Sequence, residues 1–241
     1  MDARPRRARG AHRVTPIGIR LQGVGVRLGD VDVLDDVSLD LDARTVAVVG
    51  ENGSGKSTFA RVVGGLVRRD SGDVRVLGLD PDREARELRR RVALVFSNPD
   101  AQIVMPTVRE DVAFSLRPES LPRAATDARV DAALSRFGLT DLADRSAHDL
   151  SGGQKQLLAL AGAFVREPDM VIADEPTAYL DARNARRVAD HLFEDGHRLL
   201  LVTHDLAAAR RCDAAVLFAD GRVRRVGTPS DVVAEYEAML A

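Results

Sequence analysis

One short segment, residues 50–58, constrains this chain more than any other part of its sequence. It reads Gly-Glu-Asn-Gly-Ser-Gly-Lys-Ser-Thr and fits the phosphate-binding pattern G-x-x-x-x-G-K-[ST] at every position. An apolar, β-branched run at 45–49 precedes it, and residues 59–66 follow with the apolar spacing of a helix. A strand, a glycine-rich turn and a helix in this order predict a loop that binds phosphate through backbone N–H groups at a helix N-terminus.

Lysine is rare in this chain, which makes its presence in the segment informative. Lys and Arg together number 35, yet the only lysines are Lys56 and Lys155. A compact ammonium suits phosphate oxygens, so we expect Lys56 to reach the β- and γ-phosphates of a nucleotide and Ser57 to hold Mg²⁺. The nucleotide-binding candidates in this segment are Gly50, Asn52, Gly53, Ser54, Gly55, Lys56, Ser57 and Thr58.

Composition excludes several classes of protein. The chain has 241 residues, of which 45% are hydrophobic and 30% charged, as in a soluble globular protein of one or two domains. A formal net charge of −2 argues against binding to nucleic acid through bulk charge. Cys212 is the only cysteine, so no internal disulfide forms and a cytosolic location fits. No apolar run approaches the roughly 20 residues that a membrane helix requires.

The first sixteen residues differ in character from the rest of the chain. They are rich in arginine and contain no apolar stretch, so they do not read as a secretory signal. We predict a disordered basic tail over 1–16; contact with anionic lipid headgroups is the alternative.

Alternating strands and helices predict an α/β fold. Residues 17–26 and 33–41 alternate polar and apolar side chains, as half-buried antiparallel strands do. Helical stretches separate several further apolar runs, and this order favours a mainly parallel sheet with an antiparallel β edge around a phosphate-loop core. The buried strands are expected at 45–49, 92–96, 170–173, 199–202 and 214–218. Residues 229–241 read as a closing helix with Ser230 as its N-cap.

The middle of the chain follows a different pattern. No convincing strand interrupts residues 97–165, which we therefore predict to form a helical subdomain inserted into the α/β core. The core then comprises 17–96 and 166–241, and 17–241 is a single domain. The helices expected in the insertion are 107–116, 124–137 and 154–165.

Two carboxylates follow the apolar run at 170–173. Asp174 at a strand end near a phosphate loop suits Mg²⁺, held directly or through water. Glu175 suits a base that polarises the attacking water. The Asp-Glu pair alone is a weak signal, but together with a full phosphate loop it indicates nucleotide hydrolysis.

A second candidate anion site precedes the helix expected at 154–165. Residues 150–154 read Leu-Ser-Gly-Gly-Gln, so Ser151 and the N–H groups of Gly152 and Gly153 would lie at a positive helix N-terminus. An ordinary N-cap with a flexible glycine pair is the alternative.

Together these motifs resemble the nucleotide-binding subunit of the ATP-binding cassette (ABC) family, over about residues 17–235. The resemblance implies a head-to-tail dimer in which each ATP lies between one subunit's phosphate loop and the other subunit's Leu-Ser-Gly-Gly-Gln motif. Ser151 and Gly153 would then contact the γ-phosphate held by the partner, with Gly152 and Gln154 beside them.

Two more elements match the family. Ala178-Tyr179-Leu180-Asp181 resembles the loop that crosses the dimer interface, which makes Asp181 a further nucleotide-site candidate. His204, in Val-Thr-His-Asp at a strand end, resembles the histidine that contacts the γ-phosphate, whereas a lone histidine after a strand is more often structural. The resemblance thus implies Glu175, His204 and Lys56 as the catalytic residues.

Two positions depart from the family pattern. Leu28 stands where an aromatic residue usually stacks on adenine. Because leucine offers no π-stacking, adenine binding would be weaker by about 1 kcal/mol. Ser97 stands where a glutamine usually reaches toward Mg²⁺ and the membrane partner. We expect its shorter side chain to act on the metal through water; a different coupling to the partner is the alternative.

The segment 98–114 resembles energy-coupling factor (ECF) vitamin and metal uptake systems. Pro99 and Pro106 are expected to bracket a short helix that carries Gln102. The family places a groove here for arginine-bearing helices of a membrane coupling protein, with candidate acidic contacts at Asp100, Glu110 and Asp111. For Glu110 and Asp111, a solvated acidic helix start is the alternative.

The sequence therefore predicts an ATPase that drives uptake through an ECF-type complex. The segment 174–184 resembles biotin-type subunits most, with cobalt- and nickel-type subunits close behind. The expected cofactors are ATP and Mg²⁺, and the expected partners are a second ATPase subunit, a coupling protein and a substrate-binding membrane protein, but no nucleic acid. The expected location is peripheral, on the cytoplasmic face of the membrane. An ATPase of a binding-protein-dependent importer and a soluble non-transport ABC ATPase remain the alternatives.

Overall fold

The computed structural model describes residues 18–194 and 196–240, so the predicted tail over 1–16 lies outside the described residues. A six-stranded sheet forms the centre of the molecule, and all its strands run parallel except the last, which pairs antiparallel with its neighbour. The predicted α/β class is confirmed. In sheet order the strands are β5 (Val92–Phe96), β6 (Met170–Asp174), β7 (Arg198–Val202), β3 (Thr45–Gly50), β8 (Ala214–Ala219) and β9 (Arg222–Gly227).

A second, antiparallel sheet has the order β2-β1-β4. Its strands are β1 (Ile19–Leu28), β2 (Val31–Leu41) and β4 (Ser71–Val76). The alternation in the first two strands is observed, since Val37, Leu39 and Leu41 all point to the buried face. Neither β4 nor β9 was predicted, because each is short and exposes most of its side chains. In β9 these are mainly arginines, and charge on a sheet edge discourages pairing with another chain.

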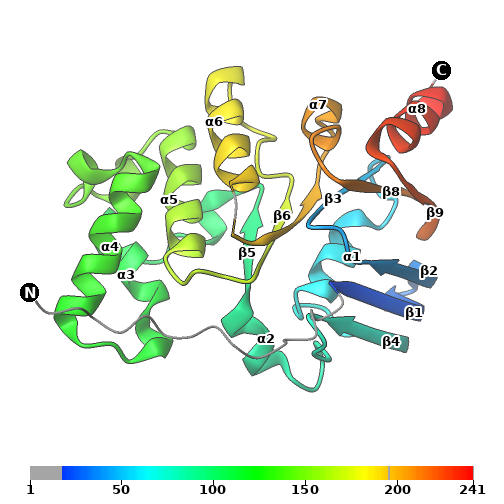
Figure 1. Cartoon of the computed structure of the whole chain (residues 1–241), viewed down its shortest axis with the longest axis horizontal. Helices are drawn as coiled ribbons and strands as arrows, with labels where there is room; N and C mark the ends of the chain where they lie inside the picture. The colour runs from blue at the N-terminus through cyan, green and yellow to red at the C-terminus, as the bar shows by residue number, and fades with distance from the viewer. Residues whose placement is uncertain (1–17, 195, 241) are drawn as a thin grey trace, which may run out of the picture.

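Helix α1 (Lys56–Val63) lies between the two sheets (Figure 1). Its apolar face packs with Val46 and Val48 of β3 and with the inner face of the antiparallel sheet. Ala47 and Val49 of β3 point to the other core, under the remaining helices. Because β3 is buried on both faces, the phosphate loop that follows it starts from a rigid strand.

Helices alone occupy the described stretch between β5 and β6, and Figure 1 shows them gathered beyond the β5 edge. Helix α5 is buried along most of its length between α3, α4, α6 and β5. Helices α3, α4 and α5 each begin and end within two residues of the three helices predicted for the insertion. The helices of the chain are α1, α2 (Ala85–Arg91), α3 (Val108–Ser115), α4 (Arg123–Phe137), α5 (Gly152–Phe164), α6 (Ala182–Phe193), α7 (Leu206–Ala209) and α8 (Pro229–Leu240).

Two local predictions were wrong. Helix α8 begins at Pro229, and Thr228 caps it by accepting the N–H of Asp231 at 3.3 Å, so Ser230 is not the N-cap. The helix expected to carry Gln102 is a single 3₁₀ turn, Pro99–Ala101, and Gln102 follows it.

The side chain of Gln102 has a structural task at the open edge of β5. Its Oε1 accepts the N–H of Phe96 at 2.8 Å, and its Nε2 donates to the carbonyl of Leu94 at 2.9 Å. The amide thus replaces the missing neighbouring strand at this edge.

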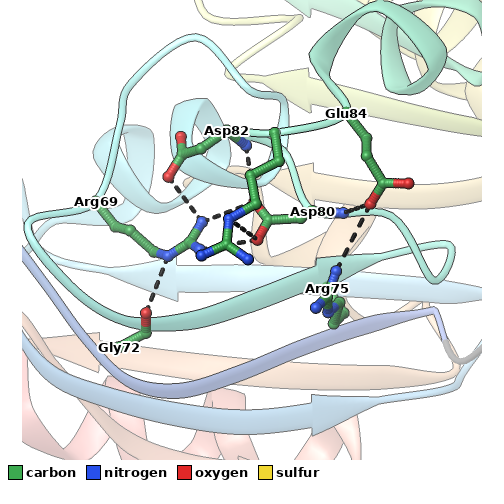
Figure 2. Close-up of polar contacts among 7 residues, drawn as sticks. Arg69, Gly72, Arg75, Asp80, Asp82 and Glu84 are labelled. Atoms are coloured by element: carbon green, nitrogen blue, oxygen red, sulfur yellow. Dashed lines mark hydrogen bonds and ion pairs between the residues drawn. The ribbon is translucent and has the colours of Figure 1, made fainter.

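A buried ion-pair cluster ties the loop after α1 to the turn after β4 (Figure 2). The guanidinium of Arg69 donates to both carboxylate oxygens of Asp80, at 3.0 and 2.9 Å, and also reaches Asp82 at 2.7 Å. Asp80 is only 1% exposed. The hydrogen bonds from Arg69 lower the pKa of Asp80 to about 2 although burial alone would raise it.

The cysteine of this chain is buried in the core. Burial raises the pKa of the Cys212 thiol to about 12. Among the described residues no helix combines the length and the apolar character that crossing a membrane demands.

Candidate active site

The phosphate loop joins β3 to α1, and its glycines are required for different reasons. Gly50 has a φ of 147°, and a Cβ there would lie 2.2 Å from the carbonyl oxygen of Phe218. A Cβ on Gly55 would lie 2.8 Å from the carbonyl oxygen of Val33. Gly53, with a φ of 80°, would meet nothing within 4 Å, so it is needed for its conformation and faces open space.

Backbone hydrogen bonds from distant segments hold this loop. The N–H of Gly221, in the turn after β8, donates to the carbonyl of Ser54 at 3.1 Å, and the N–H of Asp35 donates to the carbonyl of Gly221 at 3.0 Å. Gly221 was not among the residues predicted for the site. The dipeptide Asp220-Gly221 indicates a turn, but its contact with the loop is long-range.

Lys56 is folded into the loop. The side chain is 6% exposed, and its Nζ donates to the carbonyls of Gly50 and Glu51, both at 2.7 Å. Burial lowers the pKa of Lys56, while the carboxylates of Glu175 and Asp174 oppose that change. The ammonium therefore lies among acceptors in the centre of the site.

Ser57 and Asp174 form the candidate metal position. The Oγ of Ser57 donates to Oδ1 of Asp174 at 2.9 Å. Ser97 directly follows Phe96, which pairs with Asp174 in the sheet, so it lies beside the same strand end. Mg²⁺ prefers oxygen ligands and commonly takes only one or two from protein. That preference fits this pair. No group of three or more His, Cys, Asp or Glu side chains suited to a metal occurs among the described residues.

Glu175 and His204 face each other after adjacent strands. Oε2 of Glu175 accepts the backbone N–H of His204 at 3.3 Å, and Oε1 lies 3.2 Å from Nε2 of the histidine ring. Glu175 has a positive φ of 51°, and its own N–H donates to the carbonyl of Val202 at 2.9 Å. A positive φ in a non-glycine residue costs free energy and concentrates at functional sites.

Burial shifts the pKa of both side chains of this pair. It raises the pKa of Glu175, as expected for a carboxylate that accepts a proton from water more readily. Burial and the nearby charge of Lys56 lower the pKa of His204, which favours the neutral ring. The pair can hold a water molecule next to an acceptor of raised basicity.

Three buried side-chain atoms among the described residues lack a hydrogen-bond partner, and two belong to this site. They are Ser54 Oγ in the phosphate loop and Glu175 Oε1, which makes no hydrogen bond although the His204 ring nitrogen lies 3.2 Å away. Buried polar atoms are nearly always paired in folded proteins. The unpaired hydroxyl of Ser54 beside an open glycine cradle therefore fits a site built for a phosphate.

The Leu-Ser-Gly-Gly-Gln segment caps α5. Ser151 and Gln154 form a reciprocal capping box, with the N–H of Ser151 donating to the Gln154 side chain at 2.9 Å. Gly152 would carry a Cβ into open space, whereas a Cβ on Gly153 would lie 2.6 Å from the side chain of Asn184. Gly153 therefore permits α5 and α6 to approach closely, and Gly152 is the glycine of this segment that faces open space.

Asp181 and Leu28 are the two nucleotide-site candidates outside the phosphate loop and the start of α5. The carboxylate of Asp181 caps α6, accepting the N–H groups of Arg183 and Asn184 at 2.9 Å and the Asn184 side chain at 2.7 Å. These hydrogen bonds lower the pKa of Asp181. Leu28 ends β1 and is 48% exposed. The structure thus gives Asp181 a structural task that the sequence analysis did not foresee.

Two acidic candidates for contact with a membrane partner are already engaged. Asp111 is 7% exposed, and its Oδ1 accepts the N–H groups of Val104 and Met105 at 2.8 and 3.0 Å. Glu110 forms a capping box with Thr107. The expectation that Asp111 pairs with a partner's arginine is therefore corrected, because its carboxylate already closes the turn before α3.

Comparison with known proteins decides the family. The family profile described as "ABC transporter" matches residues 34–178, the part that holds the phosphate loop, the capping segment of α5 and Glu175. This chain belongs to the ABC transporter family. Its enzymatic activity is accordingly ATP hydrolysis, and the domain binds ATP.

Curated relatives agree with this assignment. A protein of Deinococcus radiodurans described as a putative ABC transporter ATP-binding protein is 42% identical, over 92% of this chain and 98% of that protein. The energy-coupling factor transporter ATP-binding protein EcfA1 of Bacillus subtilis is 40% identical over 83% of this chain and 73% of its own length. The biotin transport ATP-binding protein BioM of Rhizobium etli is 35% identical over 93% of this chain and 100% of its own length.

Solved structures of ABC ATPases share the fold. The structure of cbiO1 from Clostridium perfringens, described as part of the ABC transporter complex cbiONQ, has a TM-score of 0.81 and 31% identity, over 93% of this chain and 94% of that chain. A dimeric structure of the ATP-binding cassette MJ0796 bound to ADP and Pi has a TM-score of 0.76 and 27% identity, over 88% of this chain and 98% of that chain.

Proposed function

We propose that this chain is the ATPase subunit of an ECF-type uptake transporter. The named relatives EcfA1 and BioM support the transport class, and the Glu175–His204 pair beside the phosphate loop carries the hydrolytic part of the proposal. In this proposal the helical subdomain, 97–165, links the α/β core, 17–96 and 166–241, to the membrane partner.

The chemistry follows from the residues at the strand ends. Backbone N–H groups of the phosphate loop and the ammonium of Lys56 bind the phosphates of ATP. Ser57 and Asp174, with Ser97 beside them, would hold Mg²⁺, which neutralises charge on the phosphates when bound. Glu175 orients water and accepts its proton, and the backbone N–H of His204 holds the carboxylate in place.

The second half of the site comes from another subunit. Ser151, Gly152, Gly153 and Gln154 lie at the N-terminus of α5, where a helix favours anions. We place them on the γ-phosphate of a head-to-tail partner, which is another copy or a related ATPase chain. Leu28 covers one face of adenine, and Asp181 lies in the loop that crosses the interface.

The remaining parts of the proposal concern the membrane. A coupling protein and a substrate-binding membrane protein complete the transporter, and this subunit docks on the cytoplasmic face without contacting nucleic acid. Biotin is the proposed substrate because the biotin transport protein BioM aligns over its whole length. Cobalt or nickel is second, because segment 174–184 also resembles the subunits of cobalt- and nickel-type systems.

Purification from native membranes tests the transport class. A tagged copy should bring down a coupling protein and a small substrate-binding membrane protein. Recovery of an extracytoplasmic binding protein with two large membrane subunits instead would identify an ordinary importer, and recovery of no membrane protein would identify a soluble ABC ATPase.

Uptake assays test the energy source and the substrate. Cells that carry Glu175→Gln should lose uptake of labelled biotin. Glu237→Gln on α8, which alters an exposed ion pair with Arg210 at the end of α7, should retain uptake. Uptake of cobalt or nickel but not biotin would overturn the substrate and leave the ATPase role in place.

A further inference from the structure

Gln156 is a buried polar side chain that the proposed chemistry does not use. It lies on α5 and is only 1% exposed, and the residues that follow it, Leu157 and Leu158, belong to the apolar core. Burying an amide is unfavourable unless the amide is hydrogen-bonded, and the net gain from one hydrogen bond is small. A glutamine at this position is therefore better explained by the geometry that it fixes than by the stability that it adds.

The amide of Gln156 holds the end of β5. Its Nε2 donates to the carbonyl of Phe96 at 3.1 Å, and Oε1 of Gln102 accepts the N–H of Phe96 at 2.8 Å. Phe96 is the last residue of the strand and pairs with Asp174 in the sheet. Two glutamine side chains from different segments thus fix both polar groups of one backbone residue.

The contact with Phe96 also sets the position of Ser97. The carbonyl of Phe96 belongs to the same planar peptide unit as the N–H and Cα of Ser97, so fixing this carbonyl fixes the point from which the serine side chain starts. A single torsion separates the Ser97 backbone from its hydroxyl, so the side chain cannot make up for a shifted backbone as a longer one can. The hydroxyl is free to take a ligand, because it makes no hydrogen bond to another described residue.

The helix that holds Ser97 in this way also begins at the second anion site. Gly152, at the open start of α5, precedes Gln156 by about one helical turn. Both residues line a groove of about 370 Å³ together with Ser97. One helix therefore fixes Ser97 relative to the segment proposed to meet a partner's ATP.

We propose that Gln156 is a positioning residue, which places the hydroxyl of Ser97 at the Mg²⁺ position through the peptide unit between Phe96 and Ser97. This inference rests on the metal position of the proposed function, at Ser57 and Asp174. The consequence is that a side chain that touches neither nucleotide nor metal sets the affinity for Mg²⁺–ATP without affecting the affinity for metal-free ATP.

Nucleotide titrations with and without metal test the proposal. Gln156→Met keeps an unbranched side chain of similar length and removes the amide donor. Its affinity for a non-hydrolysable ATP analogue should fall about tenfold in Mg²⁺, the lower end of the loss expected when a metal site loses an orienting partner, and should not change in EDTA. Val130→Ala, a buried change on α4 in the same core, should lower the unfolding midpoint and leave the ratio of the two affinities unchanged. Equal losses with and without metal in Gln156→Met would show a role in folding alone and overturn the proposal.

A double-mutant cycle tests whether the effect passes through Ser97. Ser97→Ala should itself lower the affinity in Mg²⁺, and Gln156→Met should add little in that background, because the hydroxyl that it positions is absent. A further tenfold loss in the double mutant would overturn the proposal. An unchanged affinity in Mg²⁺ for Gln156→Met would refute this inference alone, whereas a parent protein that binds equally well in Mg²⁺ and in EDTA would refute the metal position of the proposed function as well.

Discussion

Removing the carboxylate of Asp80 should destabilise the fold by an amount that depends on pH. Arg69 holds the pKa of Asp80 at about 2, against an ordinary value of 3.8. A difference of this size corresponds to about 2 kcal/mol of stability. Because the pKa is lowered in the folded state, this contribution is present above about pH 4 and disappears as the pH falls through about 2.

The assay is denaturant unfolding of wild type and Asp80→Asn at several pH values. At pH 7 we expect the variant to lose at least about 2 kcal/mol, and up to about 5, since it leaves a nearly buried guanidinium short of a partner. Between pH 5 and 2 the wild type should lose about 2 kcal/mol more than the variant, because the other carboxylates titrate in both.

An exposed ion pair provides the matched control. Arg20 and Asp40 pair on the open face of the antiparallel sheet with about half of the Asp40 side chain accessible, so Asp40→Asn should cost less than about 1 kcal/mol. If Asp80→Asn and wild type lost stability in parallel as the pH fell, the cluster would not be the source of the acid sensitivity.

The remaining predictions concern the ATP site and the turn beside it. Glu175→Gln should keep ATP binding and lower the rate of phosphate release by at least about a hundredfold, the usual contribution of a base; wild-type turnover would exclude Glu175 from that role. Lys56→Ala should weaken ATP binding to the lone subunit, whereas Ser151→Arg should preserve it and block dimer formation; equal losses in calorimetric titration would refute a site shared between subunits. Ser97→Gln should preserve or raise ATPase activity, and a fall of more than about tenfold would indicate a site shaped around the small side chain. Asp111→Asn should lower the free energy of unfolding by about 1–3 kcal/mol, because it weakens two buried backbone hydrogen bonds; an unchanged unfolding midpoint would return Asp111 to the list of partner contacts.

Local sequence was sufficient for much of this protein. The phosphate loop, the buried parallel strands and the start of α5 each depend on residues close together in the chain, so motif and periodicity identified them. The same holds for the placement of Asp174 and Glu175 at a strand end, because a short apolar run stops there.

Elements with weak local patterns were missed. In β4, buried and exposed side chains alternate only at the end of the strand, and β9 consists mostly of charged side chains. Both segments form strands because a neighbouring strand supplies hydrogen bonds. The cap of α8 was assigned two residues late, since Thr228 and Ser230 are both good caps and only the backbone path selects one.

The tertiary structure alone decided which polar residues are free to act. Sequence placed Asp111 on a surface and Asp181 at an interface, but the fold assigns both carboxylates to backbone N–H groups. It also joined Gly221 to the phosphate loop. The residue types were readable because a motif encodes chemistry within a few positions. The contacts of Asp111 and Asp181 are local as well, but which of several possible partners a carboxylate takes depends on the path of the backbone and on burial. The contact between Gly221 and Ser54 joins segments more than a hundred residues apart, which only the packed chain brings together.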